Sequence, residues 1–448
     1  MRKADVVVIG GSAAGLTAAI TCRRHYPQKS VLMIRKEEQV LIPCGIPYIF
    51  GTVAGPQKDI MSDAALEKNS IGLLIDEVSD IDPQGRVVIT SGGEKVTYEK
   101  LIMAMGSDPM VLPIPGVDKK NVFTAKKEVT SLQKMLDTLD QSANLVIVGG
   151  GFIGVEFADE CNKNRDINVS IVEMLPHCLM LAFDDELCTA AEEVVKTAGI
   201  NIFAPEKVVA FEGDGKVSSA RLESGKELPA DMVILGIGAV ASTALAKKIG
   251  LELGPARGIK VNRYMRTSDD NIFACGDCAD KWSFFDGSPS NIKLASIAAQ
   301  EARIAGANLF GARRMNKGVV TVFSTVVGDK AFGLAGLSTL EAVKKGYNVV
   351  VGEAEAPNRH PGGMGGMALL KVKLVFEIGT GVILGGQIMG AKSGGELLNA
   401  ISACIQQGMS VDDVAAFPVG THPALTASPI AYQLTNAAEM AIKAMKSA

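Results

Sequence analysis

The chain has 448 residues, of which 47% are hydrophobic and 48 are glycine. This length and composition fit a compact α/β protein of two or three domains and exclude a disordered or fibrous chain. With 45 Lys and Arg against 49 Asp and Glu, the net charge is −4, so electrostatic binding to nucleic acid or to an acidic membrane is not supported and a small-molecule ligand is expected.

Targeting and redox signals favour a cytoplasmic protein. The first apolar run, residues 6–9, leads straight into glycine and is too short for a signal peptide. No apolar stretch is long enough to span a bilayer. Eight cysteines without regular spacing are typical of cytosolic thiols rather than of a disulfide framework.

The chain begins with the pattern of a nucleotide-binding strand, turn and helix. An apolar run is followed by Gly10-Gly11-Ser12-Ala13-Ala14-Gly15 and a helical stretch to about Tyr26. Backbone N–H groups and the dipole at the start of such a helix stabilise a pyrophosphate. Ser12 stands at the usual middle glycine, and the next strand ends in Arg35-Lys36-Glu37, which leaves ribose contact to Glu37 or to the backbone. For this loop alone, a glycine-rich turn of an unrelated α/β domain stays open.

A second copy of the pattern follows in Gly149-Gly150-Gly151-Phe152-Ile153-Gly154, which matches G-x-G-x-x-G fully. Glu173 ends the next apolar run, 22 residues after Gly151 (173 − 151), near the ~20-residue spacing of a carboxylate that binds a ribose 2′-hydroxyl. Met174 follows it rather than Arg or Lys. The second copy therefore favours NADH over NADPH.

A cysteine lies shortly after the first strand, turn and helix, in Ile42-Pro43-Cys44-Gly45-Ile46-Pro47-Tyr48. An ordinary cysteine, with a pKa near ~8.5, is mostly protonated at neutral pH, so a reactive Cys44 needs local positive potential. If residues 45–48 open a helix, its amino-terminal dipole supplies that potential. The alternative for Cys44 is a small buried apolar residue, the usual role of a cysteine.

Three further segments complete a resemblance to a known family. Residues 98–109 resemble a strand and turn that close an FAD site, and residues 267–277 resemble a second FAD fingerprint ending in Asp277. Leu294-Ala295-Ser296 resembles the start of a helix whose amino terminus faces the flavin. Together with the glycine runs, these segments make the chain similar to the pyridine nucleotide-disulfide oxidoreductases. Within them it looks like the single-cysteine group of coenzyme A disulfide reductases, NADH oxidases and NADH-dependent persulfide reductases.

The resemblance implies an α/β fold with two Rossmann-like nucleotide-binding domains, for FAD and NAD, and an α+β carboxyl-terminal domain that pairs two subunits. The expected domains are a discontinuous FAD domain at 1–115 and 245–325, an NAD domain at 116–244 and a dimerisation domain at 326–448. In the last of these, the apolar pattern predicts strands at 369–376 and 382–389 and helices at 394–407 and 430–446. A homodimer with FAD and NADH as cofactors is thus implied.

The same resemblance implies which residues hold the cofactors. Asp277 takes the role of the aspartate that contacts the ribityl chain, and Glu156 that of a glutamate near the nicotinamide. The full set of expected cofactor-binding residues is Gly10, Ser12, Ala13, Gly15, Arg35, Lys36, Val78, Ala104, Gly106, Gly149, Gly151, Phe152, Ile153, Gly154, Glu156, Glu173, Gly238, Asp277, Leu294 and Ala295.

Cys44 is implied to be the catalytic thiol, placed against the flavin. The dithiol relatives carry a partner cysteine five positions later, where this chain has Ile49. The oxidised state is therefore expected to be a mixed disulfide with an outside thiol, or a sulfenic acid. The remaining cysteines are interpreted as packing residues. They include the C-x-x-C pair of Cys275 and Cys278, because no second pair stands at zinc-ligand spacing and no metal site is expected.

Two histidines resemble active-site residues of the family. His422, in Thr421-His422-Pro423-Ala424, matches a segment that brings a catalytic base to the active cysteine in dithiol relatives, but Ala427 replaces the orienting glutamate and the role of His422 stays open. His360 lies where coenzyme A reductases line the active site with a histidine and tyrosines. Here glycines, Met364 and Met367 replace the tyrosines, which suggests a roomier or more apolar pocket.

A coenzyme A site is expected on the first helix and at His360, with binding of the coenzyme itself left open. Thr17, Thr21 and Arg24 stand at i, i+4 and i+7 and share one helix face. Arg24 matches an arginine that meets the coenzyme phosphates in the family, and a solvated surface arginine is the alternative.

The leading hypothesis is an NADH-dependent FAD reductase that cleaves S–S bonds of small persulfides, polysulfides or coenzyme A-linked disulfides through Cys44. The first alternative is an NADH oxidase that reduces dioxygen at the flavin. The second is a non-enzymatic redox sensor that responds to NADH.

Overall fold

The computed structural model describes residues 1–446 and divides into two compact units. Unit 1 comprises residues 1–112, 123–141 and 237–319, and unit 2 comprises residues 113–122, 142–236 and the chain from 320 onward. Unit 2 holds both the second nucleotide-binding fold and the carboxyl-terminal sheet. The three-domain division expected from the sequence stays a prediction, although the unit limits lie close to its cuts.

The core of unit 1 is a parallel five-stranded sheet in the order β19-β8-β2-β3-β4. Its central strand β2 (Val6–Ile9) is buried at all four positions, as expected for an apolar run that is covered on both faces. The other strands are β3 (Val31–Arg35), β4 (Gly72–Ile75), β8 (Lys100–Met103) and β19 (Ile272–Ala274).

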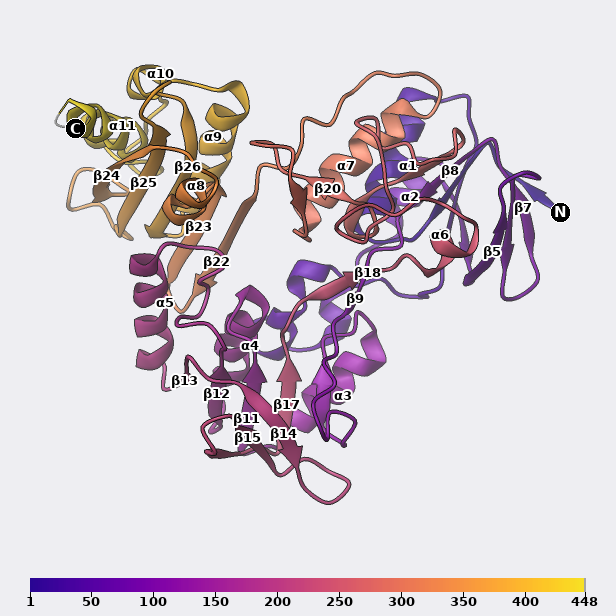
Figure 1. The fold of residues 1–448 in the computed structure, drawn as a ribbon, viewed down its shortest axis with the longest axis horizontal. Helices are drawn as coiled ribbons and strands as arrows, with labels where there is room; N and C mark the ends of the chain where they lie inside the picture. The colour runs from indigo at the N-terminus through magenta and orange to yellow at the C-terminus, as the bar shows by residue number, and fades with distance from the viewer. Residues whose placement is uncertain (447–448) are drawn as a thin grey trace. The chain divides into compact units, whose positions relative to one another are not determined.

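Two helices of unit 1, α1 (Ala13–His25) and α7 (Ala295–Asn308), lie side by side (Figure 1). A glycine allows their close approach, because a Cβ atom on Gly306 would lie 2.6 Å from the carbonyl oxygen of Ala18. The predicted first helix is therefore confirmed, and it packs against a segment almost 300 residues later in the chain.

The remaining elements of unit 1 are smaller. They form the sheet β1-β7-β6-β5, the pairs β9–β18 and β20–β21, and short helices. Their bounds are β1 (Arg2–Lys3), η1 (Pro43–Gly45), η2 (Pro47–Phe50), η3 (Pro56–Asp59), α2 (Ala64–Lys68), β5 (Val78–Asp82), β6 (Val87–Thr90), β7 (Lys95–Thr97), β9 (Ser107–Pro109), α3 (Val129–Leu139), β18 (Ala239–Ala241), α6 (Ala244–Lys248), η4 (Gly276–Cys278), β20 (Lys281–Trp282) and β21 (Pro289–Ser290).

Unit 2 contains a second sheet, β10-β17-β11-β12-β13, in which β17, β11, β12 and β13 run parallel. A small antiparallel sheet, β14-β15-β16, accompanies it. The bounds are β10 (Val122–Thr124), β11 (Asn144–Val148), α4 (Phe152–Asn162), β12 (Asn168–Val172), α5 (Asp185–Thr197), β13 (Asn201–Phe203), β14 (Val208–Glu212), β15 (Ser219–Leu222), β16 (Glu227–Pro229) and β17 (Met232–Leu235).

The carboxyl-terminal part of unit 2 is an antiparallel sheet, β22-β23-β26-β25-β24. Helix α9 packs on β23 and β26, and α11 packs on β24 and β25 (Figure 1). The predicted strands and helices are confirmed within a few residues. Their bounds are β22 (Val322–Val327), β23 (Lys330–Gly336), α8 (Thr339–Lys344), β24 (Val349–Pro357), β25 (Leu369–Glu377), β26 (Ile383–Gly390), α9 (Gly394–Gln407), α10 (Val411–Ala415), η5 (Pro429–Ala431) and α11 (Gln433–Met445).

The expected fold class, two Rossmann-like folds with an α+β carboxyl-terminal part, is thus confirmed. Among residues 1–446, every helix is too short or too polar to cross a lipid bilayer.

A buried carboxylate ties the nucleotide-binding part of unit 2 to its carboxyl-terminal sheet. Asp184 accepts hydrogen bonds from Thr339 Oγ1 at 2.6 Å and Gln387 Nε2 at 2.6 Å, and it pairs with Lys373 Nζ at 2.8 Å. Burial raises the pKa of this carboxyl, but the bonds from Lys373, Thr339 and Gln387 outweigh burial and lower the pKa to about 2. Glu186 is a second partner of Lys373.

The first prediction concerns acid stability. Because the pKa of Asp184 is depressed in the folded protein, its contribution is present above the unfolded value of 3.8 and is lost as the pH falls toward 2. The free energy of unfolding should fall by about 2 kcal/mol over this range from Asp184 alone. Urea unfolding at a series of pH values should show a shallower acid slope in Asp184→Asn. The exposed neighbour Asp185, changed to Asn, is the control, and equal slopes in the wild type and Asp184→Asn would contradict the prediction.

Candidate active site

The first glycine run forms a backbone cradle at the carboxyl end of β2. Gly10 has φ +105°, and a Cβ atom on it would lie 2.2 Å from the carbonyl oxygen of Ala104. A Cβ atom on Gly15 would lie 1.9 Å from the carbonyl oxygen of Gly10. The side chain of Ser12, the N-cap of α1, makes no capping hydrogen bond. The first N–H groups of α1 are therefore left for a ligand, which fits a pyrophosphate.

The segment around Asp277 meets this cradle. Gly276 has φ +78°, and a Cβ atom on it would lie 2.8 Å from Cβ of Ala14 in α1. Asp277 follows in η4, and its Oδ2 accepts a hydrogen bond from Ser107 Oγ at 2.8 Å. The first glycine run, residues 98–109 and residues 267–277 therefore converge at the carboxyl ends of the strands in the unit 1 sheet.

A buried ion pair lies behind Asp277. Lys281 Nζ donates to the carbonyl oxygen of Gly276 at 2.6 Å and pairs with Glu301 Oε2 at 3.2 Å. The same carboxylate accepts from the N–H of Gly276 at 2.9 Å. Burial raises the pKa of Glu301 to about 7, with Lys281 opposing the rise. Sequence reasoning missed this pair, although Glu301 shares a buried face of α7 with the apolar residues Ile297, Ala298 and Ile304.

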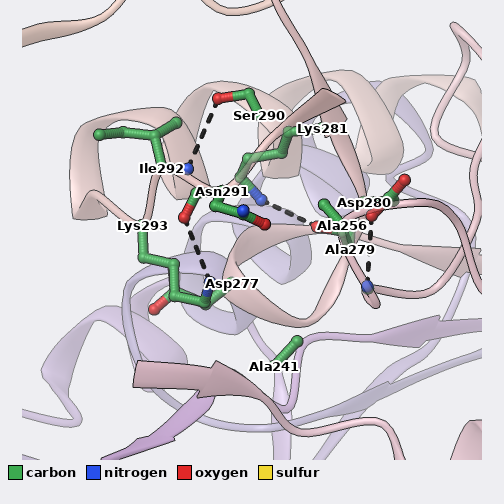
Figure 2. A pocket seen from close by; sticks show the side chains of 11 residues that line it. Ala241, Ala256, Asp277, Ala279, Asp280, Lys281, Ser290, Asn291, Ile292 and Lys293 are labelled. Atoms are coloured by element: carbon green, nitrogen blue, oxygen red, sulfur yellow. Dashed lines mark hydrogen bonds between the residues drawn. The ribbon is translucent and has the colours of Figure 1, made fainter. Parts of the chain in front are cut away.

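A small hollow opens beside Asp277 (Figure 2). Lys293, the residue before the N-cap of α7, lines it and donates to the carbonyl oxygen of Asn291 at 3.2 Å. Burial lowers the pKa of Lys293, and Asp277 opposes this shift. Leu294 and Ala295 follow as the N-cap and first residue of α7, and the backbone there has no side-chain cap.

The other residues expected around FAD occupy varied environments. The Arg35 guanidinium donates to Asp63 Oδ1 at 2.6 Å, to Asp63 Oδ2 at 2.8 Å and to the Glu37 carbonyl oxygen at 2.9 Å, so most of its donors are used within the protein. Lys36 is exposed. Val78 begins β5, and Gly106 and Gly238 have φ +72° and +100°.

The second glycine run repeats the cradle in unit 2. Gly149 has φ +104°, and a Cβ atom on Gly154 would lie 1.8 Å from the carbonyl oxygen of Gly149. The N-cap of α4 is Gly151, which carries no capping side chain. Glu173 lies at the end of β12, where its carboxylate accepts from the N–H groups of Gly150 at 2.6 Å and Leu175 at 2.7 Å.

The start of α4 faces the carboxyl-terminal sheet within unit 2. Phe152 packs against Phe323, with ring centroids 4.5 Å apart, while Ile153 is exposed. Glu156 Oε1 accepts from Thr325 Oγ1 at 2.7 Å, and burial raises the pKa of Glu156. Thr325 is a partner that the sequence did not indicate.

Cys44 is the exposed cysteine of the chain, and the other seven are buried. It lies in η1 (Pro43–Gly45), which is followed by η2 (Pro47–Phe50). The α-helix hypothesised at residues 45–48 is therefore wrong, because prolines at positions 43 and 47 divide the segment into two single turns. Turns of this length lack the aligned peptide dipoles of a long helix. The alternative of a buried Cys44 is also wrong.

The buried cysteines behave as packing residues. Burial raises the pKa of Cys275, and it raises the pKa of Cys278 to about 11. No disulfide joins any of the eight cysteines within residues 1–446.

The structure brings His360 and His422 together, which the sequence did not indicate. His360 N–H donates to the Pro423 carbonyl oxygen at 3.1 Å, and His360 Nδ1 lies 3.1 Å from the Thr426 carbonyl oxygen. His422 Nδ1 accepts from the N–H of Ala424 at 3.2 Å. A neutral His422 therefore carries its proton on Nε2, which is free of that bond.

The proposed coenzyme A face of α1 is only partly accessible. Arg24 is exposed, but Thr21 is buried with its Cβ against Gly306 of α7. Thr17 is half-buried. Thr21 therefore does not share an open surface with Arg24.

Comparison with known proteins decides the family. The family model for pyridine nucleotide-disulphide oxidoreductases matches residues 4–302, and the model for the dimerisation domain of that family matches residues 322–430. The chain belongs to the pyridine nucleotide-disulphide oxidoreductase family. The resemblance inferred from the sequence is confirmed. The chain is accordingly an oxidoreductase that uses FAD and a nicotinamide dinucleotide, and the two backbone cradles fit these cofactors.

Several relatives are similar over most of their length. A coenzyme A polysulfide/persulfide reductase from Pyrococcus horikoshii is 32% identical and covers 87% of this chain and 88% of its own. An NADH oxidase from Methanocaldococcus jannaschii is 29% identical over 98% of both chains. Among solved structures, a NAD-dependent persulfide reductase from A. fulgidus has a TM-score of 0.91 at 28% identity, covering 99% of this chain and 84% of its own. A water-forming NADH oxidase from Lactobacillus brevis has a TM-score of 0.89 at 25% identity, covering 100% and 99%.

The second prediction separates the two cradles of this oxidoreductase. Gly15→Ala places a Cβ atom 1.9 Å from the Gly10 carbonyl oxygen, and Gly154→Ala places one 1.8 Å from that of Gly149. Gly15→Ala should yield protein with little bound flavin. Gly154→Ala should keep its flavin but bind NADH at least about tenfold more weakly, because the backbone must shift where it would contact the pyrophosphate.

Flavin absorbance after gel filtration and NADH titration of the flavin spectrum under anaerobic conditions would measure both effects. Gly379→Ala, in a turn of unit 2 where the glycine has no positive φ and a Cβ atom meets nothing within 4 Å, is a control for the cost of substituting a glycine. Loss of flavin from Gly154→Ala alone would contradict the assignment of the two cradles.

Proposed function

We propose that the chain is an NADH-dependent flavoprotein reductase that cleaves S–S bonds of small persulfides, polysulfides or coenzyme A-linked disulfides through Cys44. The observation that carries this proposal is the exposure of Cys44 in unit 1, the unit that holds the first cradle, while the other seven cysteines are buried. A thiol that meets an external sulfur substrate must be accessible, and a buried thiol is inert. Relatives named as persulfide and polysulfide reductases support the same substrate class.

The chemistry assigned to Cys44 is an exchange at sulfur. Its thiolate attacks one sulfur of the substrate, the S–S bond breaks, and the other sulfur leaves as a thiolate. The product is a mixed disulfide on Cys44, whose reduction by two electrons returns the Cys44 thiolate and releases the second sulfur fragment. NADH supplies these electrons and becomes NAD⁺, and water supplies the protons of the released thiols. Bound FAD supplies two-electron redox chemistry between nicotinamide and sulfur.

Residues of both cradles hold the cofactors in this proposal. In unit 1, the backbone from Gly10 to Gly15 and the Asp277 carboxylate would hold FAD. In unit 2, the backbone from Gly149 to Gly154 would hold the NADH pyrophosphate, with Glu173 at the ribose. Because Met174 follows Glu173 and carries no charge, NADH is the preferred donor.

We also propose a homodimer, supported by the dimerisation-domain match over residues 322–430. His360 and His422, joined through Thr426, lie in loops of this part of the chain. Coenzyme A as a ligand is supported by Arg24, which is exposed on α1, and by relatives with coenzyme A in their names. A cytoplasmic location is supported by eight cysteines without disulfides in the described chain.

An NADH oxidase is the second candidate function. Relatives and solved structures named as NADH oxidases cover nearly all of the chain. In that function dioxygen, rather than a sulfur compound, accepts the electrons, and two electrons reduce one dioxygen to hydrogen peroxide or four reduce it to two waters.

The third prediction tests the role of Cys44. Cys44→Ser should lower turnover of coenzyme A disulfide and polysulfide at least about 100-fold, because serine cannot form the mixed disulfide. The rate at which NADH bleaches the flavin should stay within about twofold of the wild type. Anaerobic stopped-flow reduction, followed by a panel of sulfur acceptors and dioxygen, measures each step.

Ser91 is exposed and has no part in the proposed site. The variant Ser91→Ala therefore controls for losses of activity that come from expressing and purifying a variant rather than from the missing thiol. Full turnover of sulfur acceptors by Cys44→Ser would refute the proposal. A wild-type protein that turns over dioxygen far faster than any sulfur acceptor would favour the oxidase.

A further inference from the structure

The turn that carries Asp277, η4, lies between the first turns of two helices. A Cβ atom on Gly276 would lie 2.8 Å from Cβ of Ala14 in α1 and 3.5 Å from Cβ of Ala298 in α7. With φ +78°, Gly276 has a left-handed conformation that other residues rarely adopt. The turn therefore meets the cradle at the start of α1 at close range.

Asp277 is the part of this turn that reaches the surface. Residues 272–281 are otherwise buried, whereas Asp277 is half-buried and lines the hollow beside the turn (Figure 2). Because Asp277 directly follows Gly276 in the chain, the backbone dihedral angles of Gly276 set the direction in which the Asp277 side chain leaves the turn.

Lys281 and Glu301 hold both peptide groups that flank Gly276. The Gly276 N–H, in the peptide that precedes this residue, donates to Glu301 Oε2 at 2.9 Å. The Gly276 carbonyl oxygen, in the peptide that leads to Asp277, accepts from Lys281 Nζ at 2.6 Å. Because each peptide group is planar, holding both of them fixes the two soft dihedral angles of Gly276.

The ammonium group and the carboxylate are themselves held in place. Lys281 Nζ also donates to the carbonyl oxygen of Ala279 at 3.1 Å and pairs with Glu301 Oε2 at 3.2 Å, so three acceptors surround it. Glu301 lies one turn after Ala298 in α7, the helix whose first turn flanks Gly276. The side chains of Lys281 and Glu301 are only 3% and 2% exposed.

This arrangement contributes little to the stability of the fold. Removing two charges from water offsets much of their attraction, so a buried ion pair is often no more stabilising than apolar side chains of similar volume. Glu301 Oε1 is also buried without a hydrogen-bond partner among residues 1–446, which adds to the cost. Apolar side chains, however, supply neither an acceptor for the Gly276 N–H nor a donor for its carbonyl oxygen.

We propose that Lys281 and Glu301 are positioning residues of the FAD site, which hold the peptide groups of Gly276 so that the Asp277 carboxylate lies in place for the ribityl chain. Because the turn is ordered by these hydrogen bonds, FAD binding costs less conformational entropy and the bound cofactor dissociates more slowly. The inference rests on the proposed contact of Asp277 with FAD and is independent of the role of Cys44.

Release of FAD from the full-length holoenzyme tests this role. Two double variants remove both charges. In Lys281→Met/Glu301→Gln the amide oxygen still accepts from the Gly276 N–H, whereas in Lys281→Met/Glu301→Leu neither peptide group is held. After dilution, the fluorescence of released FAD should rise about threefold faster than in the wild type for the first variant and at least about tenfold faster for the second. Equal rates in the two double variants, or in the leucine variant and the wild type, overturn the proposal.

An exposed ion pair of the same unit gives a matched control. Lys260 Nζ and Glu252 Oε2 lie 2.7 Å apart, and both side chains are exposed. The same substitutions there, Lys260→Met/Glu252→Leu, should leave the rate of FAD release within about twofold of the wild type. An increase as large as that of Lys281→Met/Glu301→Leu overturns the proposal.

The variant Asp277→Ala distinguishes positioning from a general loosening of the fold. Alone, it should speed FAD release at least about tenfold, because the ribityl chain loses its carboxylate partner. In the Asp277→Ala background, Lys281→Met/Glu301→Leu should speed release by less than about twofold more, since no carboxylate is left to position. A merely structural role predicts the same increase in both backgrounds, and that result overturns the proposal.

The same rates separate this inference from the proposed function. Unchanged FAD release in Asp277→Ala refutes the proposed contact of Asp277 with FAD, and the inference fails with it. Faster release in Asp277→Ala, with wild-type release in the leucine variant, overturns the inference alone. Neither result changes the test of Cys44, which is turnover of sulfur acceptors. If the leucine variant does not fold, Lys281→Met/Glu301→Gln takes its place, and Asp277→Ala should abolish its increase of about threefold.

Discussion

Close approach of backbone to backbone is the constraint on which both nucleotide sites depend. In each cradle, two stretches of main chain come so near that a single added carbon atom would collide with a carbonyl oxygen, as at Gly15 and Gly154. Because of this close approach, α1 and α4 each begin directly beyond the carboxyl end of a parallel strand. No side chain caps the first turn of either helix, at Ser12 or at Gly151. An anionic ligand can then take the place of the missing cap.

The sequence was sufficient for most of this architecture, for identifiable physical reasons. Buried parallel strands are apolar throughout, and glycine runs mark the tight turns that follow them. The sequence therefore located α1 almost to the residue, and it located the start of α4 after the second glycine run. The spacing of apolar residues likewise located the strand β25 and the helix α9. These signals are local, and local pattern is what a single sequence displays.

Other features could not be read from local pattern. The turn at Cys44 was expected to open an α-helix, but Pro43 and Pro47 divide it into two single turns. The pairing of Glu156 with Thr325 joins positions 169 residues apart, and the hydrogen bond between Gly276 and Glu301 joins positions 25 residues apart. Such contacts depend on how the chain is folded back on itself, and neighbouring residues do not record this.

The buried ion pair of Lys281 and Glu301 has a consequence for how this chain can diverge. The two residues are 20 positions apart in the sequence (301 − 281). Glu301 accepts a hydrogen bond from the N–H of Gly276, and Lys281 donates one to the carbonyl oxygen of Gly276. Loss of one partner strands the other charge in the core, whereas joint replacement by apolar residues of similar volume can be nearly neutral. A substitution at only one of the two positions therefore destabilises the fold, whereas substitution at both positions together is tolerated. Homologues should accordingly have either both residues charged or both uncharged.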